Sequence, residues 1–461
     1  MTHVEQLATF VTSASYSHIS EAARQALKIR VLDALGCAIG ALEGPPVRAI
    51  RALAEELGGN PLATLIGGGK TSPDRAAFYN AALVRYLDFN DSYLTKGETF
   101  HPNDNVGAVL AASEYADKSG KELLTSLAVA YQVQARLSEV APVRARGFDH
   151  TTQGAYAVAA GVSRALDLNS DQTANAIAIS GTALNALRVT RTGWLSNWKG
   201  LAYPYTVFGA TQAAFLAKYG ITGPLEVFEG NKGFMDSVAG QFSIDWSKED
   251  LEAVLRSSVK KYNAEFHSQS ALEGLLELRA ELRATHHLQA GQIERIDVSI
   301  FDVAYNIIGG GEEGDKRQVR TKEEADHSLP YMLAVALLDG EVTPAQYEPE
   351  RIVHEDVQTL LRKISIHPDE DFSRRFPQEM PCHIRVCLTN GQVYEIEKHD
   401  FEGFHTRPLA WEGAVAKFEK LATPYTSADQ RQALADTIHD LDSTDVRVLT
   451  ALLATVGGKN A

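Results

Sequence analysis

The chain has 461 residues, 44% of them hydrophobic, which is enough for one large core or two domains. Its formal net charge of -15 argues against nucleic acid or an anionic membrane as a partner, and any site for an anionic small molecule has to gather positive charge locally. Three cysteines, no signal-peptide pattern at the N-terminus and no apolar run of spanning length together predict a reducing, cytoplasmic location without a membrane partner.

The first part of the chain is predicted to be helical. Ser20 can cap a helix in which Leu27, Val31 and Leu35 recur at near-helical spacing. Helical periodicity and high alanine content follow over residues 106–116, 122–137, 156–166 and 170–187. Small residues at many facing positions allow helices to approach closely, as in a compact bundle. We therefore expect a large all-α domain over residues 1–267.

The pattern changes in the second part of the chain. Residues 293–300 end in the alternation of a half-buried strand, and residues 383–396 form a predicted hairpin whose tight turn is Asn390-Gly391. Helices are expected over 323–338 and 353–363. These elements predict a smaller α+β lid domain over residues 268–402. Residues 403–461, with helices at 411–421 and 427–454, are expected to return to the helical domain, so the fold class is mainly α.

Acid–base chemistry is best supported by the stretch from residue 86 to residue 105. A helical run delivers Asp88 and Asp91 into a polar loop that then presents Thr95 and His101. A carboxylate and an imidazole can take one proton and give another, as acid–base catalysis requires. The alternative is a structural one, since Asp, Asn and Thr also favour helix caps and turns.

Cationic side chains gather at other element boundaries. His150 follows an arginine-rich helix end, where a lone histidine can also be structural. Residues 188–199 hold three cations, Arg188, Arg191 and Lys199, together with two tryptophans, and the alternative for them is an ordinary solvated loop. Residues 260–267 lie at the predicted domain junction, where ligand pockets often form.

Metal and nucleotide sites find no support in the sequence. His286 and His287 are adjacent in a polar connector and are expected to be exposed rather than to be ligands. No Gly-x-Gly-x-x-Gly pattern follows a strand, and residues 67–71 lack the first glycine of a P-loop. We therefore expect neither a metal ion nor a nucleotide cofactor.

Several long motifs resemble those of the MmgE/PrpD family, and within it those of the subgroup that dehydrates 2-methylcitrate. They are Leu-Asp-Phe-Asn-Asp-Ser-Tyr at 87–93, His-Pro-Asn-Asp-Asn at 101–105, Ala-Glu-Phe-His-Ser-Gln-Ser at 264–270 and Ala-Asp-His-Ser-Leu-Pro-Tyr at 325–331. The likeness runs from about residue 5 to residue 425. It implies an all-α domain plus an α+β lid, a homodimer, and a cofactor-independent site between the domains.

The family also contains cis-aconitate decarboxylases, and these are similar at single residues. Asp91, Thr95 and His101 have the spacing of the decarboxylase Asp, Thr and His, while His150 and Lys260 match a further histidine and a lysine. The chain departs from the pattern at Glu265, which takes the place of another decarboxylase histidine. Lys199 is offset by insertions from the lysine of that loop. These departures favour dehydration over decarboxylation.

The leading hypothesis is therefore a dehydratase that converts 2-methylcitrate into 2-methylaconitate, with citrate as a second candidate substrate. A tricarboxylate needs cations for binding, a base for the carbon-bound proton, and a proton for the leaving hydroxide. The expected catalytic residues are Asp91, His101 and His150. The expected substrate-binding residues are Thr95, Arg188, Arg191, Lys199, Lys260, Glu265 and His267. The residues leave open which of Asp91 and His101 is the base.

Two alternatives remain. The first is a decarboxylase of cis-aconitate, or an isomerase of a related dicarboxylate, on the same scaffold. The second is a helical binding protein without catalysis.

Overall fold

The computed structural model describes the chain except for residues 96, 194, 286–289 and 458–461, so the expectation for His286 and His287 lies outside the described residues. The chain divides into two compact units. We call the first the helical unit; it comprises Met1–Arg191, Asn197–Val259 and Ala410–Ala461. We call the second the mixed unit; it comprises Thr192–Ser196 and Lys260–Leu409.

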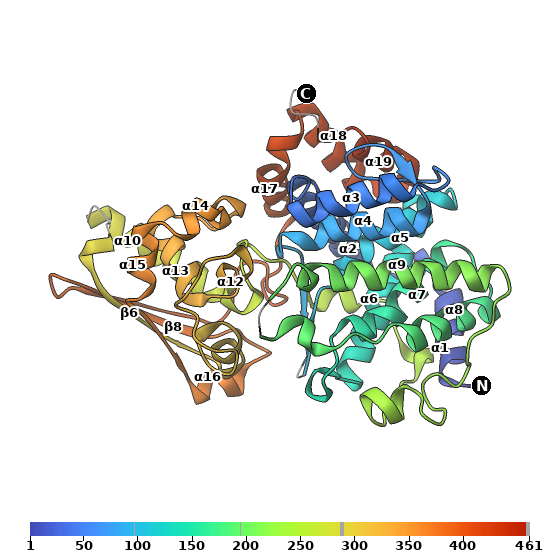
Figure 1. Cartoon of the computed structure of the whole chain (residues 1–461), viewed down its shortest axis with the longest axis horizontal. Coiled ribbons are helices and arrows are strands. Elements are labelled where there is room, and N and C mark those ends of the chain that lie inside the picture. The colour runs from blue at the N-terminus through green and yellow to red at the C-terminus, as the bar shows by residue number, and fades with distance from the viewer. Residues whose placement is uncertain (96, 194, 286–289, 458–461) are drawn as a thin grey trace. The chain divides into compact units, whose positions relative to one another are not determined.

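The helical unit is built mainly from long helices that pack on one another (Figure 1). Its helices are α1 (His3–Ser13), α2 (Glu21–Gly40), α3 (Pro45–Leu57), α4 (Pro73–Tyr86), α5 (Val106–Tyr115), α6 (Gly120–Val140), α7 (Thr151–Ala165), α8 (Ser170–Ala183), α9 (Trp198–Lys218), α17 (Trp411–Ala422), α18 (Ala428–His439) and α19 (Val446–Leu453). Two small antiparallel sheets join them: β1 (Ala63–Thr64) with β2 (Lys70–Thr71), and β3 (Ser92–Leu94) between β4 (Thr99–Phe100) and β5 (Ser257–Ser258).

Small residues allow the central helices of this unit to approach closely. A Cβ atom on Gly107 of α5 would lie 2.5 Å from the backbone nitrogen of Ala81 in α4. A Cβ on Gly154 of α7 would lie 2.5 Å from the ring of Tyr203 in α9. Interiors packed at this density do not absorb an extra methyl group without strain. Glycine at these positions therefore sets the spacing of α4, α5, α7 and α9.

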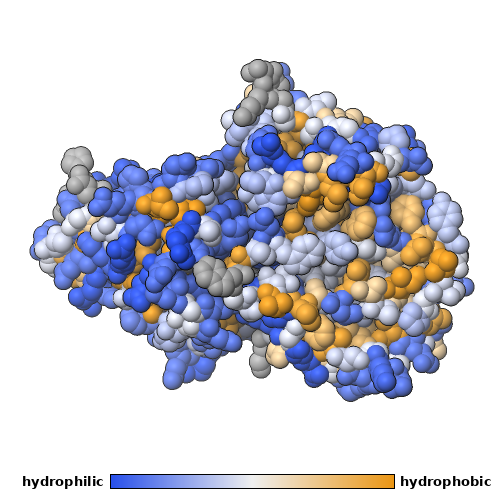
Figure 2. Space-filling view, in the orientation of Figure 1, coloured by the Kyte–Doolittle hydropathy of each residue, from blue (hydrophilic) through white to orange (hydrophobic). Residues whose placement is uncertain are grey.

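The surface of the helical unit carries exposed hydrophobic side chains. Figure 2 shows hydrophobic residues gathered on the face that carries α3 and α9, whereas the same view of the mixed unit is mostly hydrophilic. Large hydrophobic residues exposed on these two helices include Leu53, Leu57, Trp198, Tyr205 and Leu216. Large hydrophobic side chains exposed in such number on one face are often found where a protein binds a partner. Among the described residues, no helix combines the length and the hydropathy needed to cross a membrane.

The mixed unit contains a four-stranded sheet in the order β7-β6-β8-β9. Its strands are β6 (Ile293–Ile300), β7 (Ile364–Pro368), β8 (Cys382–Leu388) and β9 (Val393–Lys398); β6 pairs parallel with β7, and the other pairs are antiparallel. Its helices are α10 (Gln269–Thr285), α11 (Asp302–Ala304), α12 (Lys322–Ala325), α13 (Leu329–Asp339), α14 (Pro349–Ile352), α15 (Glu355–Leu361) and α16 (Glu370–Arg375). Figure 1 shows α10, α13 and α15 along one side of the sheet.

The mainly helical fold with a smaller α+β part, expected from the sequence, is confirmed. The strand at 293–300 and the hairpin are also confirmed, and Gly391 of the turn has a φ of +86°. The expected helix at 323–338 is wrong as one element, because the chain breaks between α12 and α13. Ser328 caps α13 there by accepting from the Tyr331 N–H, and Pro330, which lacks an N–H, lies in the first turn.

One further expected helix is shortened and another is divided. The helix expected at 353–363 forms as α15 but begins at Glu355, after a break at residues 353–354 that follows α14. The segment 427–454 forms α18 and α19, separated by a short 3₁₀ turn at Leu441–Ser443. The helix expected at 170–187 ends earlier, at Ala183, because Leu184 leaves the helical conformation with a φ of -117° and a ψ of 71°.

The close approach of α5 to α4 can be tested by adding one methyl group. We expect Gly107→Ala to lower the free energy of unfolding by about 1–3 kcal/mol, because the new Cβ would meet backbone atoms that cannot rotate away. Gly200→Ala is the matched control, since no described atom lies within 4 Å of its Cβ position in α9, and alanine should be neutral there or stabilise by up to about 1 kcal/mol. Urea unfolding followed by circular dichroism measures both; equal stabilities would contradict this account of the packing.

Candidate active site

The candidate site is built around the loop that leaves α4 and returns to α5. Asp88 has a φ of +52°, a left-handed conformation that aspartate tolerates better than most residues. The chain then forms the hairpin of β3 and β4, and a 3₁₀ turn at Pro102–Asn105 leads into α5. This path brings residues 88–91 against residues 101–104, so side chains ten or more positions apart share hydrogen bonds.

Asp91 is fully buried, and both of its carboxylate oxygens have partners. Oδ1 accepts from the Asn103 backbone N–H at 3.0 Å, and Oδ2 accepts from the Tyr131 hydroxyl at 2.8 Å. The guanidinium of Arg30 lies 3.8 Å from Oδ2. Burial raises the pKa of Asp91 to about 7, although Arg30 and these two donors act in the opposite direction and the charge of Asp33 adds to the rise.

His101 is oriented by backbone and side-chain oxygens. Its Nδ1 lies 2.7 Å from the main-chain oxygen of Asp91 and 3.1 Å from the Ser92 hydroxyl. A carbonyl oxygen can only accept, so the proton of the neutral ring is on Nδ1 and Nε2 carries the lone pair. The expected carboxylate–imidazole couple is therefore joined in the structure through the carbonyl of Asp91.

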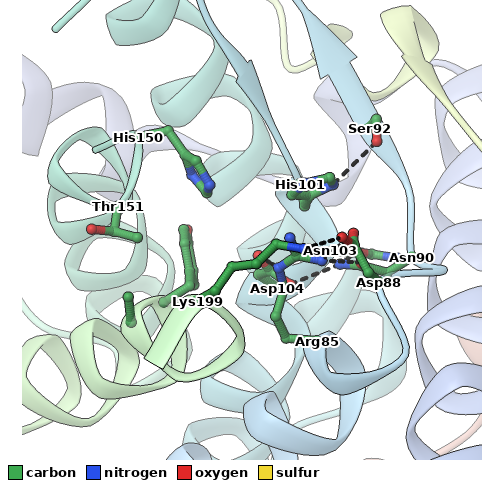
Figure 3. A network of polar contacts seen from close by, with 12 residues as sticks. Arg85, Asp88, Asn90, Ser92, His101, Asn103, Asp104, His150, Thr151 and Lys199 are labelled. Atoms are coloured by element: carbon green, nitrogen blue, oxygen red, sulfur yellow. Dashed lines mark hydrogen bonds and ion pairs between the residues drawn. The ribbon is translucent and has the colours of Figure 1, made fainter. Parts of the chain in front are cut away.

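His150 lies beside His101 and is held neutral. Their ring centroids are 5.9 Å apart in an edge-to-face arrangement, and His150 also stacks on Tyr203 at 5.9 Å. In Figure 3 the two imidazoles point toward one another. Burial lowers the pKa of His150 to about 3, and Asp149, 3.8 Å from its Nε2, does not overcome that effect. Its Nδ1 is buried and has no hydrogen-bond partner among the described residues.

Asp149 anchors the two arginines of the expected cationic loop. Arg191 donates to it at 2.7 Å, and Arg188 lies 3.7 Å from the same oxygen. Burial alone would raise the pKa of Asp149, but Arg191, His150 and Arg188 hold it well below its usual range. The Arg191 guanidinium also donates to the main-chain oxygen of Lys199, at 3.3 Å. The structure therefore gathers Arg188, Arg191 and Lys199 next to His150.

A chain of alternating charges runs from Lys199 into the protein interior. The Lys199 ammonium lies 3.4 Å from Asp88, and Arg85 donates to the other oxygen of Asp88 at 2.6 Å. Figure 3 shows Lys199 extending from α9 toward Asp88. Arg85 also lies 3.8 Å from Asp104, which accepts from the Asn90 amide at 2.7 Å. Burial raises the pKa of Asp104 to about 7, although Arg85 and Arg191 oppose the shift.

Thr95 has local partners within its own turn. Its hydroxyl accepts from the Glu98 N–H at 3.0 Å and donates to the Glu98 carbonyl at 3.2 Å. Glu98 in turn accepts from the N–H groups of Val143 and Arg144, both at 2.6 Å. The sequence predicted that Thr95 contacts the substrate. In the structure its hydroxyl is hydrogen-bonded within the turn to Glu98, and the Glu98 side chain links this turn to Val143 and Arg144.

The remaining expected residues lie in the mixed unit. Lys260, Glu265 and His267 are all buried, and Glu265 lies 2.7 Å from His267 Nδ1. Burial tends to raise the pKa of Glu265, but the nearby charges of His267, His327 and Lys260 hold it below its usual value. His267 is only 1% exposed, and its ring contacts those of Phe266, Phe301 and Phe376.

Several polar residues at the site were not singled out as site residues from the sequence. Arg85 and Tyr131 lie inside segments that the sequence predicted only to be helical, and their partners Asp88 and Asp91 lie in the loop after α4. Asp104 belongs to the recognised His-Pro-Asn-Asp-Asn motif, which was the one signal that could have identified it. In the mixed unit, His327 Nδ1 lies 2.5 Å from Asp326, a pair that the Asp-His dipeptide could also have indicated.

Both halves of the chain match known protein families. The MmgE/PrpD N-terminal domain matches residues 5–247, and the MmgE/PrpD C-terminal domain matches residues 262–443. The chain is 28% identical to a 2-methylcitrate dehydratase of Salmonella typhi over 455 residues, covering 91% of this chain and 90% of that protein. It is 28% identical to the 2-methylcitrate dehydratase of Escherichia coli strain K12 over 412 residues, covering 83% and 82%. It is also 25% identical to a cis-aconitate decarboxylase of Mus musculus over 477 residues, covering 97% and 93%.

The buried carboxyl of Asp91 predicts a pH-dependent stability. Its pKa rises from an ordinary 3.8 to about 7 in the folded chain, so its proton stabilises the fold fully below about pH 4, and this stabilisation is lost as the pH rises through 7. Asparagine has no proton that titrates in this range, so the Asp91→Asn variant does not lose this stabilisation as the pH rises. We expect the stability of the variant relative to wild type to increase from pH 4 to pH 7, with a slope of up to about 1.4 kcal/mol per pH unit for one proton.

Urea unfolding at several pH values measures this difference. Asp436→Asn, at an exposed position of α18, is the matched control and should follow the wild-type curve. Parallel curves for Asp91→Asn and wild type would contradict the raised pKa.

Proposed function

The chain belongs to the MmgE/PrpD family, and we propose on that basis that it is a dehydratase that removes water from 2-methylcitrate to give 2-methylaconitate. The observation that carries the proposal is the orientation of His101. Its Nδ1 donates to the Asp91 carbonyl, which leaves the basic lone pair on Nε2. A positioned imidazole with its lone pair on Nε2 can abstract a proton from the carbon next to a carboxylate.

His101 is the proposed general base. It takes the proton from the carbon next to a carboxylate while the carbon–oxygen bond of the neighbouring hydroxyl breaks and a double bond forms. The leaving hydroxide needs a proton to depart as water, and the imidazolium formed on His101 can supply it. Asp91 then acts through its carbonyl, which fixes the tautomer of His101. His150, neutral because its pKa is near 3, is proposed to hydrogen-bond the substrate rather than to protonate it.

Substrate charge is the second requirement, because a 2-methylcitrate molecule carries three carboxylates. The cations that surround the two histidines are Arg85, Arg188, Arg191 and Lys199, and the carboxylates paired with them are Asp88, Asp104 and Asp149. Burial favours protonated Asp104, so the cluster has a positive balance inside a protein of net charge -15. We propose that Lys199, with Arg188 and Arg191, supplies the attraction for the substrate carboxylates.

The mixed-unit residues keep their proposed part in substrate binding. Lys260 is a buried cation whose charge acts on the Glu265 carboxyl, and we propose that it also attracts a substrate carboxylate. Glu265 can accept a hydrogen bond from a substrate hydroxyl. His267, enclosed by phenylalanine rings, is proposed to act by holding Glu265. For Thr95 we propose an indirect role: the turn that its hydroxyl stabilises positions the β3–β4 hairpin, and Thr95 itself does not contact the substrate.

Decarboxylation of cis-aconitate is the second candidate, since cis-aconitate decarboxylases match over nearly the whole chain. The two reactions share the need for cations and a proton-transfer group, and they differ in product. Incubation with 2-methylcitrate, citrate and cis-aconitate separates them: dehydration gives enoate absorbance, whereas decarboxylation releases carbon dioxide. An isomerase of a related dicarboxylate would give neither signal with these three compounds.

We also propose that the protein is a cytoplasmic homodimer. The supporting observation is the exposed stripe on α9 formed by Trp198, Tyr205 and Leu216, with Tyr219 at 78% exposure just after the helix. Trp198, Tyr205 and Leu216 are spaced by seven and eleven residues, so they lie on one face of α9. A second copy of the chain is the proposed occupant of this face.

Removal of the base should abolish turnover. We expect His101→Gln to lower kcat by about 100- to 10,000-fold on 2-methylcitrate, since glutamine cannot accept the proton. His439→Gln, at an exposed histidine of α18, is the control and should leave kcat unchanged. Circular dichroism checks that both variants fold. A His101→Gln variant with wild-type kcat would refute the assignment of His101, and wild-type protein inactive on the whole panel would refute the proposed reaction.

The proposed dimer predicts that charge on the α9 face will separate the subunits. Tyr205→Glu and Leu216→Glu should each shift the mass measured by light scattering toward the monomer, because a buried carboxylate without a partner destabilises an interface. Gln432→Glu, at an exposed position of α18, is the control and should remain dimeric. A wild-type chain that is monomeric, or α9 variants that stay dimeric, would contradict the proposal.

A further inference from the structure

Lys417 connects the last part of the chain to the candidate site. It lies in α17, which the chain reaches only after passing through the mixed unit. Its ammonium lies 2.6 Å from Asp33 Oδ1 and donates to the main-chain oxygen of Phe89 at 2.7 Å. It also lies 3.7 Å from the centroid of the Phe89 ring, a cation–π contact. The Lys417 side chain is only 8% exposed.

The contact with Phe89 bears on the loop that carries the acidic residues. Phe89 follows Asp88, the residue with positive φ, and precedes Asn90 and Asp91. A buried carbonyl requires a donor, and backbone in a sparsely populated conformation persists only where its surroundings fix it. Lys417 supplies that donor at the centre of the loop.

A second route leads from Lys417 to the other side of the same loop. Asp33 Oδ2 accepts from the Asn103 side chain at 3.2 Å. The Asn103 backbone donates to Asp91, and the Asn103 side-chain oxygen accepts from Asn90 at 2.8 Å. The ammonium therefore holds Phe89 directly and Asn103 through Asp33. The segments that contain these two residues flank His101 and determine the position of the Asp91 carbonyl.

We propose that Lys417 is a positioning residue for the acid–base loop: it fixes the backbone at Phe89 and, through Asp33 and Asn103, the carbonyl that orients His101. The effect on catalysis rests on the proposed function, whereas the effect on the loop does not. Lysine suits the position because one compact ammonium has three donors for Asp33, Phe89 and the ring face. Arginine would keep the positive charge, but its planar guanidinium matches the positions of the Asp33 carboxylate, the Phe89 carbonyl and the Phe89 ring less well.

A purely structural role makes a different prediction. If Lys417 served only to join α17 to α2, its loss would lower stability throughout the helical unit. At temperatures well below unfolding, kcat would then be unchanged. A positioning role instead lowers kcat with little change in KM, because the base is displaced while the cations that bind substrate remain in place.

The test compares Lys417→Met, Lys417→Arg and Lys420→Met by steady-state kinetics and by amide hydrogen exchange. Lys420 is an exposed lysine of the same helix and serves as the matched control. We expect Lys417→Met to lower kcat by about 10- to 100-fold while KM changes by less than about threefold. Exchange should become faster in peptides covering residues 87–105 and stay unchanged in α8. Lys417→Arg should recover part of both losses, and Lys420→Met should match wild type.

Wild-type kcat and wild-type exchange in Lys417→Met would overturn the proposal. So would faster exchange spread evenly over the helical unit, or faster exchange at 87–105 with unchanged kcat. A failure of the proposed function gives a different result, because wild-type protein would then turn over no substrate of the panel. Amide hydrogen exchange at residues 87–105 of Lys417→Met would still show whether Lys417 holds the loop.

Discussion

Burial of the Asp91 carboxylate in the loop between α4 and α5 constrains much of the helical unit. A carboxylate without exposed surface is tolerated only where donors and countercharges surround it. Here the donors come from α6 and from the turn before α5, and the countercharge comes from α2. The conformation of the loop therefore depends on contacts with each of these segments. The main-chain oxygen of the same residue then sets the tautomer of His101.

The other buried charges of the site are also paired with charges of opposite sign. Burial is the main reason why the His150 ring stays neutral; the positive charges of Arg191 and Arg188 add to this effect, and the Asp149 carboxylate with which they pair opposes it. Lys199 is held through Asp88 and Arg85. Cations and carboxylates alternate through the interior, and few of them face solvent. Two imidazoles with different surroundings thus lie side by side: His101 has its Nδ1 fixed by a carbonyl oxygen, and His150 is kept from protonation by burial.

Much of the fold could be predicted from the sequence, because helical periodicity and strand alternation are local properties. The α5 start after Asn105, the strand β6 and the turn at Gly391 all follow from such patterns. The breaks inside two expected helices could not be placed, since they depend on how short polar segments are capped after folding. Of the candidate site, the motif led to the prediction of Asp91 and His101, but it did not indicate that the backbone carbonyl of Asp91 contacts His101. Arg85 and Lys417 were missed because their partners are distant in sequence, and a lone charge in a helix does not indicate what it will contact.

The return of α17, α18 and α19 to the helical unit has a consequence for synthesis of the protein. During translation the first 259 residues emerge long before the helices that complete their core, and the delay covers the 150 residues from 260 to 409. At typical elongation rates this interval is on the order of 10 s, far longer than the folding time of most small domains. During this interval the surface of α2 that α17 later covers stays exposed in the nascent helical unit. The mixed unit, which is almost wholly continuous in the chain, can fold first. A ribosome-bound chain of this protein would expose that surface of α2 to chaperones at a defined and late stage.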